Sequence, residues 1–117
     1  MLKPVTVGYS IFNKAHLLPQ IIEGIKECFD EEDEIIFLLD HCTDDSYRVL
    51  LDSIRGDTIY NSKIINLKEG SDLFEIKANN ILLREATNDT IILFQDDMVC
   101  YDKDIKYIVD LGANIGT

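Results

Sequence analysis

Apolar and polar residues are arranged along the chain in blocks that predict strands separated by helices. A short apolar run covers Val5–Ser10, and apolar residues then recur every three or four positions over Leu17–Phe29. That recurrence is the spacing of one buried helix face. Pro19 lies near the start of the periodic segment, where its missing N–H is tolerated. A strand followed by a helix is therefore expected.

A second strand and helix are expected in the next third of the chain. The acidic stretch Asp30–Glu34 should break the first helix and remain a solvated run of charges. The run that follows, Ile35–Leu39, is continuously apolar, which is typical of a strand buried on both faces. Thr43 and Asp44 can cap the helix after it. The buried face of that helix is expected to comprise four residues: Tyr47, Leu50, Leu51 and Ile54.

The alternation continues, with a strand expected at Lys63–Leu67, a helix at Leu73–Ala86 and a strand at Thr90–Phe94. Strands joined through helices form right-handed crossovers and a sheet covered on both faces. We therefore predict an α/β fold with a Rossmann-like, doubly wound, mostly parallel sheet. The length of 117 residues fits one domain, spanning 1–117, with one core.

The composition of the chain argues against nucleic acid as a partner and against a membrane span. The chain has 22 acidic and 11 basic residues, a formal net charge of −11, and such a surface repels the phosphates of nucleic acids. No stretch reaches the roughly 18 apolar residues of a membrane span, and the N-terminus lacks the pattern of a signal peptide. Cys28, Cys42 and Cys100 lack zinc-site spacing, so we expect buried, reduced thiols in a cytoplasmic protein. His16 and His41 are expected on the surface.

Ligands of open α/β sheets bind beyond the carboxyl ends of the strands. Asp96 and Asp97 directly follow a strongly apolar predicted strand, and neighbouring carboxylates are unfavourable there without a positive partner. Mg²⁺ or Mn²⁺ would supply that charge and let an acidic pocket accept a diphosphate. Neither the GxGxxG nor the GxxxxGK[ST] motif is present, so a glycine cradle for phosphates is excluded.

Three segments in succession resemble the N-terminal half of family 2 glycosyltransferases: TVGYSIFNKAHLLPQII, IIFLLDHCTDDS and KANNILLREATNDTIILFQDDM. Members of that family use the GT-A fold to transfer a sugar from a nucleotide diphosphate donor. The resemblance, over about Val5 to Asp104, implies an incomplete GT-A-type domain that is truncated at its C-terminus. The acceptor-binding half, with the catalytic base, would then be absent, and no catalytic residue is assigned. The implied ligand is a nucleotide diphosphate sugar, with a UDP-sugar favoured.

The resemblance also implies individual roles in binding the nucleotide sugar. Ser10 matches the small hydroxyl residue that ends the first strand and meets the base, and Asn13 matches the asparagine that closes the same loop. Asp40 matches the acid that hydrogen-bonds the base, and Lys77 lies near a basic position that assists the diphosphate. Simpler roles exist for three of them: a turn residue at Asn13, a helix cap at Asp40 and an exposed helix lysine at Lys77.

The acidic motif near the end of the match implies the metal site. Asp96 corresponds to the residue that contacts ribose, and Asp97 to the residue that coordinates the divalent metal. Two positions depart from the family pattern, since Leu39 and Gln95 stand where the family has acids. One carboxylate remains for the base and one for the metal, which is what the chemistry requires.

The last segment leaves other functions open. Tyr107–Gly116 resembles the glycine-rich loop of S-adenosylmethionine-dependent methyltransferases, although a helix over Asp104–Leu111 ended by Gly112 is the preferred interpretation. The alternatives are therefore the leading part of a methyltransferase fusion and a non-catalytic nucleotide-binding or assembly module. Because a truncated domain would leave apolar surface uncovered, self-association as a homodimer is expected.

Overall fold

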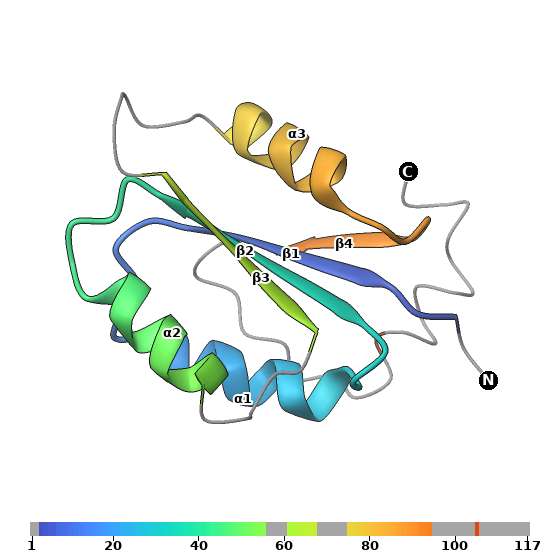
Figure 1. The fold of residues 1–117 in the computed structure, drawn as a ribbon, viewed down its shortest axis with the longest axis horizontal. Helices are drawn as coiled ribbons and strands as arrows, with labels where there is room; N and C mark the ends of the chain where they lie inside the picture. Colours follow the sequence, from blue (N-terminus) through green and yellow to red (C-terminus); the bar gives the residue numbers. More distant parts are fainter. Residues whose placement is uncertain (1–2, 56–60, 68–74, 95–104, 106–117) are drawn as a thin grey trace.

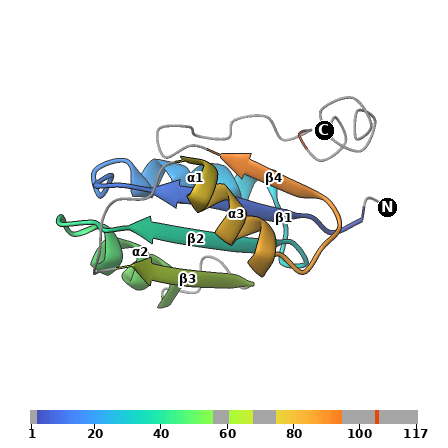
Figure 2. The same ribbon diagram turned by 90° about the horizontal axis from the view of Figure 1, so that it is seen from above.

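A computed structural model of the chain describes residues 3–55, 61–67, 75–94 and 105 and shows a parallel sheet between two layers of helices (Figure 1). The four strands lie in the order β3-β2-β1-β4, and every neighbouring pair is parallel (Figure 2). The elements are, in chain order, β1 (Thr6–Ile11), α1 (Leu18–Cys28), β2 (Glu34–Asp40), α2 (Ser46–Arg55), β3 (Ser62–Leu67), α3 (Glu75–Glu85) and β4 (Ile91–Phe94).

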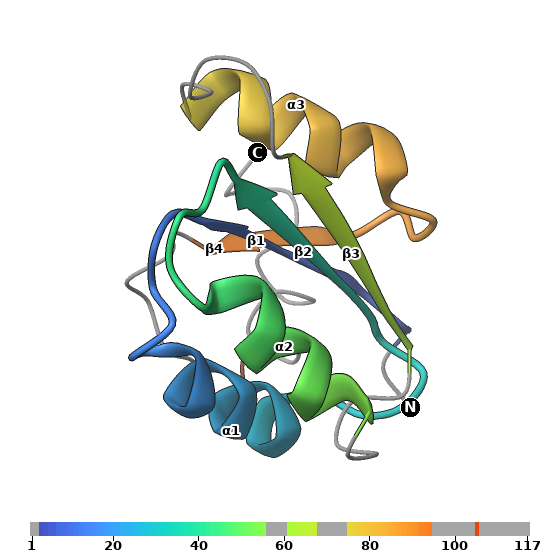
Figure 3. The same cartoon turned by 60° about the vertical axis from the view of Figure 1, so that its left-hand side comes forward.

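Helices lie on both faces of the sheet, as the alternation predicted. Among the described helices, α1 and α2 lie side by side on one face of the sheet, and α3 covers the other face (Figure 3). The α/β, Rossmann-like, doubly wound prediction is therefore confirmed. No helix among the described residues is long and apolar enough to cross a membrane.

The larger core fills the space between the sheet and helices α1 and α2. All seven residues of β2 are buried, as its continuous apolar run predicted. The ring of Tyr9 stacks between Phe37, at a centroid distance of 6.0 Å, and Phe94, at 5.0 Å. Of the predicted helix at Asp104–Leu111, only Ile105 lies within the described residues. It is helical and packs against this core.

The smaller core lies under α3. Ala78 and Leu82 of that helix pack on Ile36 and Leu38 of the central strand β2. Gly8 of β1 lies directly below, where a Cβ atom would come within 3.2 Å of Leu82 Cδ1. The missing side chain at Gly8 therefore allows α3 to approach β1 closely at Leu82.

The acidic stretch before β2 is only partly the solvated charge run expected from the sequence. Residues 30–32 are exposed, but Asp33 and Glu34 are 1% and 6% exposed. The Asp33 carboxylate accepts hydrogen bonds from the backbone N–H groups of Val5 and Asp30, at 2.9 and 3.0 Å. The expectation was wrong for these two acids because a buried carboxylate needs such donors, and Val5 reaches Asp33 only in the folded chain.

Glu34 joins three segments at the amino edge of the sheet. Its Oε1 accepts hydrogen bonds from the Thr6 hydroxyl and from the Thr87 N–H, each at 2.9 Å. Burial opposes ionisation of this carboxyl, but the hydrogen bonds from Thr87 and Thr6, with the charge of Lys63, outweigh it and lower the pKa of Glu34 below 4.5. The ionised carboxylate thus stabilises the fold.

We expect Glu34→Gln to lower the free energy of unfolding at about pH 7 by about 1–2 kcal/mol. The pKa is lower in the folded chain, so this stabilisation is present above pH 4.5 and is lost as the pH falls through the folded-state value. Urea unfolding of both proteins at about pH 7 and about pH 3 measures the difference. The matched control is Glu85→Gln, which removes an exposed ion pair with Lys63. We expect it to change the free energy of unfolding by less than about 0.5 kcal/mol. A difference between parent and Glu34→Gln that stays constant with pH would contradict the assignment.

The buried face of α2 is smaller than predicted, since Leu51 and Ile54 are only half-buried. Leu50 is fully buried, but Tyr47 is 40% exposed. The helix begins at Ser46, whose buried hydroxyl accepts a hydrogen bond from the Lys14 N–H at 3.1 Å. Asp44 does act at the helix start, because its Oδ1 accepts a hydrogen bond from the Ser46 N–H at 3.0 Å. Ser46 therefore occupies the inward position that the sequence pattern had given to Tyr47.

Candidate functional site

The strand order places the topological switch point between β1 and β4. The chain runs from β1 outward to β3 and then crosses to β4 on the other side of β1, and such points are where open α/β sheets bind ligands. Tyr9 is paired with Phe94, so the chain leaves β4 beside the end of β1. Asp96 and Asp97 follow closely in sequence but lie outside the described residues.

Ser10 and Asp40 lie on the same face of the sheet at its carboxyl edge. Side chains alternate along strands, so Ser10 shares the α3 face with Gly8, and Asp40 shares it with Leu38. Ser10 is paired with Leu38, which places Asp40 one same-face position further along β2. Ser10 is half-buried, and Asp40 is 6% exposed. A buried carboxylate and a hydroxyl therefore converge at the predicted ligand edge.

Helix α3 begins at this same edge, because it follows the carboxyl end of β3. Lys77 lies in its first turn and is exposed. Leu39, which stands where the family has an acid, is fully buried in the larger core. An acid at that position would lie on the opposite face of the sheet from Asp40, so the departure from the family pattern leaves the α3 face unchanged.

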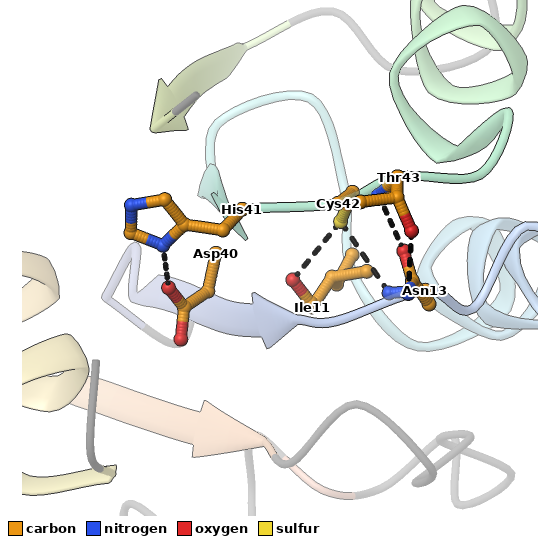
Figure 4. A network of polar contacts seen from close by, with 6 residues as sticks. All are labelled: Ile11, Asn13, Asp40, His41, Cys42 and Thr43. Atoms are coloured by element: carbon orange, nitrogen blue, oxygen red, sulfur yellow. Dashed lines mark hydrogen bonds and ion pairs between the residues drawn. The ribbon is translucent and has the colours of Figure 1, made fainter. Parts of the chain in front are cut away.

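Asn13 connects the loop after β1 to the loop after β2 (Figure 4). Its Oδ1 accepts hydrogen bonds from the N–H groups of Thr43 and Asp44, at 2.7 and 3.2 Å, and its Nδ2 donates to the Thr43 hydroxyl at 3.1 Å. Its backbone has a φ of 51°, which asparagine adopts more readily than most residues. The structure thus gives Asn13 a loop-positioning role, and its contact with a nucleotide stays a prediction.

Cys42 adds a second connection between the same loops. Its thiol donates to the Ile11 carbonyl at 3.4 Å and accepts from the Asn13 N–H at 3.4 Å (Figure 4). Burial raises the pKa of the Cys42 thiol above 9.0, so it stays protonated at neutral pH. The expectation of buried thiols is confirmed for Cys28, whereas Cys42 is half-buried, packs against the larger core and is also hydrogen-bonded. Cys100 lies outside the described residues.

Asp44 makes a further connection to the loop after β1. Its carboxylate accepts hydrogen bonds from the N–H groups of Ala15 and Ser46, each at 3.0 Å. Burial opposes ionisation, but the hydrogen bonds from Ser46 and Ala15 outweigh it and lower the pKa of Asp44. The Asp44 carboxylate therefore binds backbone groups of the protein itself, and these hydrogen bonds hold the loop after β1 against the start of α2.

His41 is not the surface histidine expected from the sequence. Its Nδ1 lies 2.6 Å from Asp40 Oδ1, and both side chains are only 9% exposed (Figure 4). Its backbone N–H donates to the Leu67 carbonyl at 2.9 Å. The expectation was wrong because the partner is the preceding residue, and the bend after β2 that brings the two side chains together is set by the sheet. His16 is exposed, as expected.

Phe12 is a candidate binding residue that the sequence reasoning missed. It directly follows β1 at the carboxyl edge and is 42% exposed. An exposed aromatic ring at a ligand edge offers a stacking surface for a nucleobase. The signal was available in the sequence, since an aromatic residue stands immediately after a buried strand that ends at the expected site.

The metal site cannot be assembled from the described part of the chain. Within residues 3–55, 61–67, 75–94 and 105, no three His, Cys, Asp or Glu side chains gather as metal ligands. The predicted ligand Asp97 and its neighbour Asp96 lie outside those ranges. Their roles therefore stay predictions.

With this geometry in place, comparison with known sequences identifies the family. The sequence profile described as "Glycosyl transferase family 2" matches residues 6–114. The chain belongs to glycosyltransferase family 2. No curated protein sequence matches it.

Solved glycosyltransferase structures share the fold of this family 2 chain. The mannosyltransferase PcManGT from Pyrobaculum calidifontis, in complex with GDP-Man and Mn²⁺, has a TM-score of 0.84 and 19% identity over 97% of this chain and 33% of its own. TarS 1-349 of S. aureus has a TM-score of 0.78 and 16% identity over 96% of this chain and 32% of its own. The same TarS fragment with UDP-GlcNAc has a TM-score of 0.75 and 18% identity, covering 97% and 31%. The likeness confirms the GT-A type of fold, and the family 2 chain spans about one third of the length of these proteins.

Proposed function

We propose that this family 2 glycosyltransferase chain binds the nucleotide diphosphate sugar that donates the sugar, with a UDP-sugar as the favoured ligand. The observation that carries the proposal is the convergence of Ser10 and the buried carboxylate of Asp40 on one face of the carboxyl edge, next to the switch point between β1 and β4. Buried polar groups at such an edge are typical of a binding site.

The edge suits a uracil base. A carboxylate at Asp40 can accept the N3–H of uracil, and the hydroxyl of Ser10 can donate to or accept from the base. Phe12 offers a ring for stacking. The network of Asn13 holds the two loops that carry these groups, so the base site is formed before the ligand binds, which reduces the ordering cost of binding.

The diphosphate site is assigned to residues beyond β4 and on α3. We propose that Asp96 contacts ribose, that Asp97 coordinates Mg²⁺ or Mn²⁺, and that Lys77 assists the diphosphate. Carboxylate oxygens are the donors that these ions prefer. The bound ion would neutralise the diphosphate and so assist its departure from the sugar. A net charge of −11 would make a bound cation favourable for an anionic ligand.

A non-catalytic nucleotide-binding module is the second candidate function. The chain spans about one third of the solved glycosyltransferases it resembles, and none of its residues is assigned to the acceptor or to the catalytic base. A methyltransferase fusion has less support, because the family match continues to residue 114 and so covers most of the glycine-rich segment. Release of UDP from a UDP-sugar in the presence of acceptors separates the transferase from the module, since the module would bind the sugar nucleotide without turnover.

We expect UDP to bind at least about tenfold more tightly with Mn²⁺ than without it, because the ion converts repulsion between carboxylates and diphosphate into attraction. Isothermal titration calorimetry of the chain with UDP, with and without Mn²⁺, measures this ratio. Uridine is the matched control ligand, because it lacks the diphosphate and its affinity should not respond to the ion. UDP binding that is unaffected by Mn²⁺ would contradict the proposed metal-dependent donor site.

A further inference from the structure

The bend after β2 places a histidine in an uncommon backbone conformation. His41 has a φ of 55°, which is unfavourable for most residues with a Cβ atom, although histidine, asparagine and aspartate adopt it more often. The backbone is held there by the hydrogen bond from the His41 N–H to the Leu67 carbonyl. In this conformation the imidazole lies beside the Asp40 carboxylate (Figure 4).

The contact between the two side chains determines which ring nitrogen donates and restrains the rotation of the carboxylate. A carboxylate only accepts hydrogen bonds, so a hydrogen bond across the 2.6 Å contact with Oδ1 of Asp40 requires a proton on Nδ1 of His41. Both side chains are 9% exposed, and hydrogen bonds to charged groups are stronger where water is excluded. The Asp40 carboxylate is thus held in one rotamer by the residue that follows it.

We propose that His41 is a positioning residue that holds the Asp40 carboxylate in the orientation in which it receives the N3–H of uracil. This inference rests on the proposed function, in which Asp40 binds the base. It extends that function by assigning part of the base affinity to a residue that does not touch the base. The bond from His41 prevents the Asp40 carboxylate from rotating away from the ligand edge.

The first test reads the tautomer in the free protein by ¹⁵N NMR. The chain contains two histidines, so the His16→Ala variant leaves His41 as the source of the imidazole signals. We expect the neutral Nδ1–H tautomer or the doubly protonated ring, either of which donates from Nδ1. A neutral Nε2–H tautomer would overturn the proposal, because Nδ1 would then carry no proton to donate.

The second test measures uridine affinity by calorimetry in three substitutions of His41. His41→Ala and His41→Gly should each weaken uridine binding by about tenfold, the loss expected when a charge-assisted hydrogen bond no longer fixes a carboxylate. His41→Asn should stay within about threefold of the parent, because asparagine tolerates positive φ and its Nδ2 can replace Nδ1 as donor. His16→Ala is the matched control and should bind uridine as the parent does.

The glycine variant separates the hydrogen bond from the backbone. Glycine adopts positive φ freely, so His41→Gly permits the bend and removes the imidazole donor. Parent-like affinity in His41→Gly, or no recovery in a folded His41→Asn, would show that the imidazole does not position Asp40. If the parent binds neither uridine nor UDP, the proposed function fails, and the tautomer measurement alone decides whether His41 holds Asp40.

Discussion

Replacing Asp97 by asparagine is expected to remove the metal-dependent part of UDP binding and leave the rest intact. The proposed ion bridges the Asp97 carboxylate and the diphosphate, and a neutral amide is a much weaker ligand for Mn²⁺ or Mg²⁺. At about 4 Å and an effective dielectric of about 20, two unit charges interact by about 4 kcal/mol. Loss of about two thirds of that attraction, about 2.7 kcal/mol, should weaken UDP binding in Mn²⁺ by about a hundredfold.

The decisive comparison for Asp97→Asn is a set of four titrations, with UDP and uridine, each with and without Mn²⁺. Uridine affinity should equal that of the parent under both conditions, which shows that the base site is intact. Asp96→Asn is the neighbouring control, and because Asp96 is assigned to ribose, it should weaken UDP with and without the ion. Should Asp97→Asn bind UDP in Mn²⁺ as tightly as the parent, Asp97 is not the metal ligand.

Replacing Asp40 by alanine is expected to weaken uridine and UDP by the same factor, about ten- to a hundredfold, as for the loss of a hydrogen bond to a charged group. The factor should not depend on Mn²⁺, because Asp40 is assigned to the base and not to the diphosphate. Calorimetry with 3-methyluridine tests the contact between Asp40 and the N3–H of the base more directly. That ligand cannot donate from N3, so the parent should discriminate against it and Asp40→Ala should not.

The control for Asp40 must separate binding from folding, since the residue is 6% exposed. Asp40→Asn keeps the shape and one acceptor oxygen, so we expect a smaller loss of uridine affinity than for Asp40→Ala. Thermal unfolding of both variants shows whether the fold persists at the temperature of the titrations. If folded Asp40→Ala still prefers uridine to 3-methyluridine by the parent's factor, the base is read by other groups.

Several local errors in the sequence reasoning share one cause. The sequence pattern predicted solvated charges at Asp33 and Glu34, a buried helix residue at Tyr47 and a surface histidine at His41. In the structure, Asp33 accepts a hydrogen bond from the N–H just before β1, and Glu34 accepts one from the hydroxyl of the first residue of β1. His41 contacts Asp40. Such partners depend on how elements are placed in three dimensions, and they are not visible in a periodic pattern of polarity.

The sequence by itself determined the order and type of the elements, because apolar periodicity and turn residues act over a few neighbouring positions. It also determined which segments end at the ligand edge, since parallel strands bring their carboxyl ends together. Only the tertiary structure decided that Ser10 and Asp40 share the α3 face, that Asn13 ties the two loops together and that His41 turns back onto Asp40. Those relations depend on strand register and on two backbone bends with positive φ, at Asn13 and His41. Both are set by hydrogen bonds between segments that are distant in the chain.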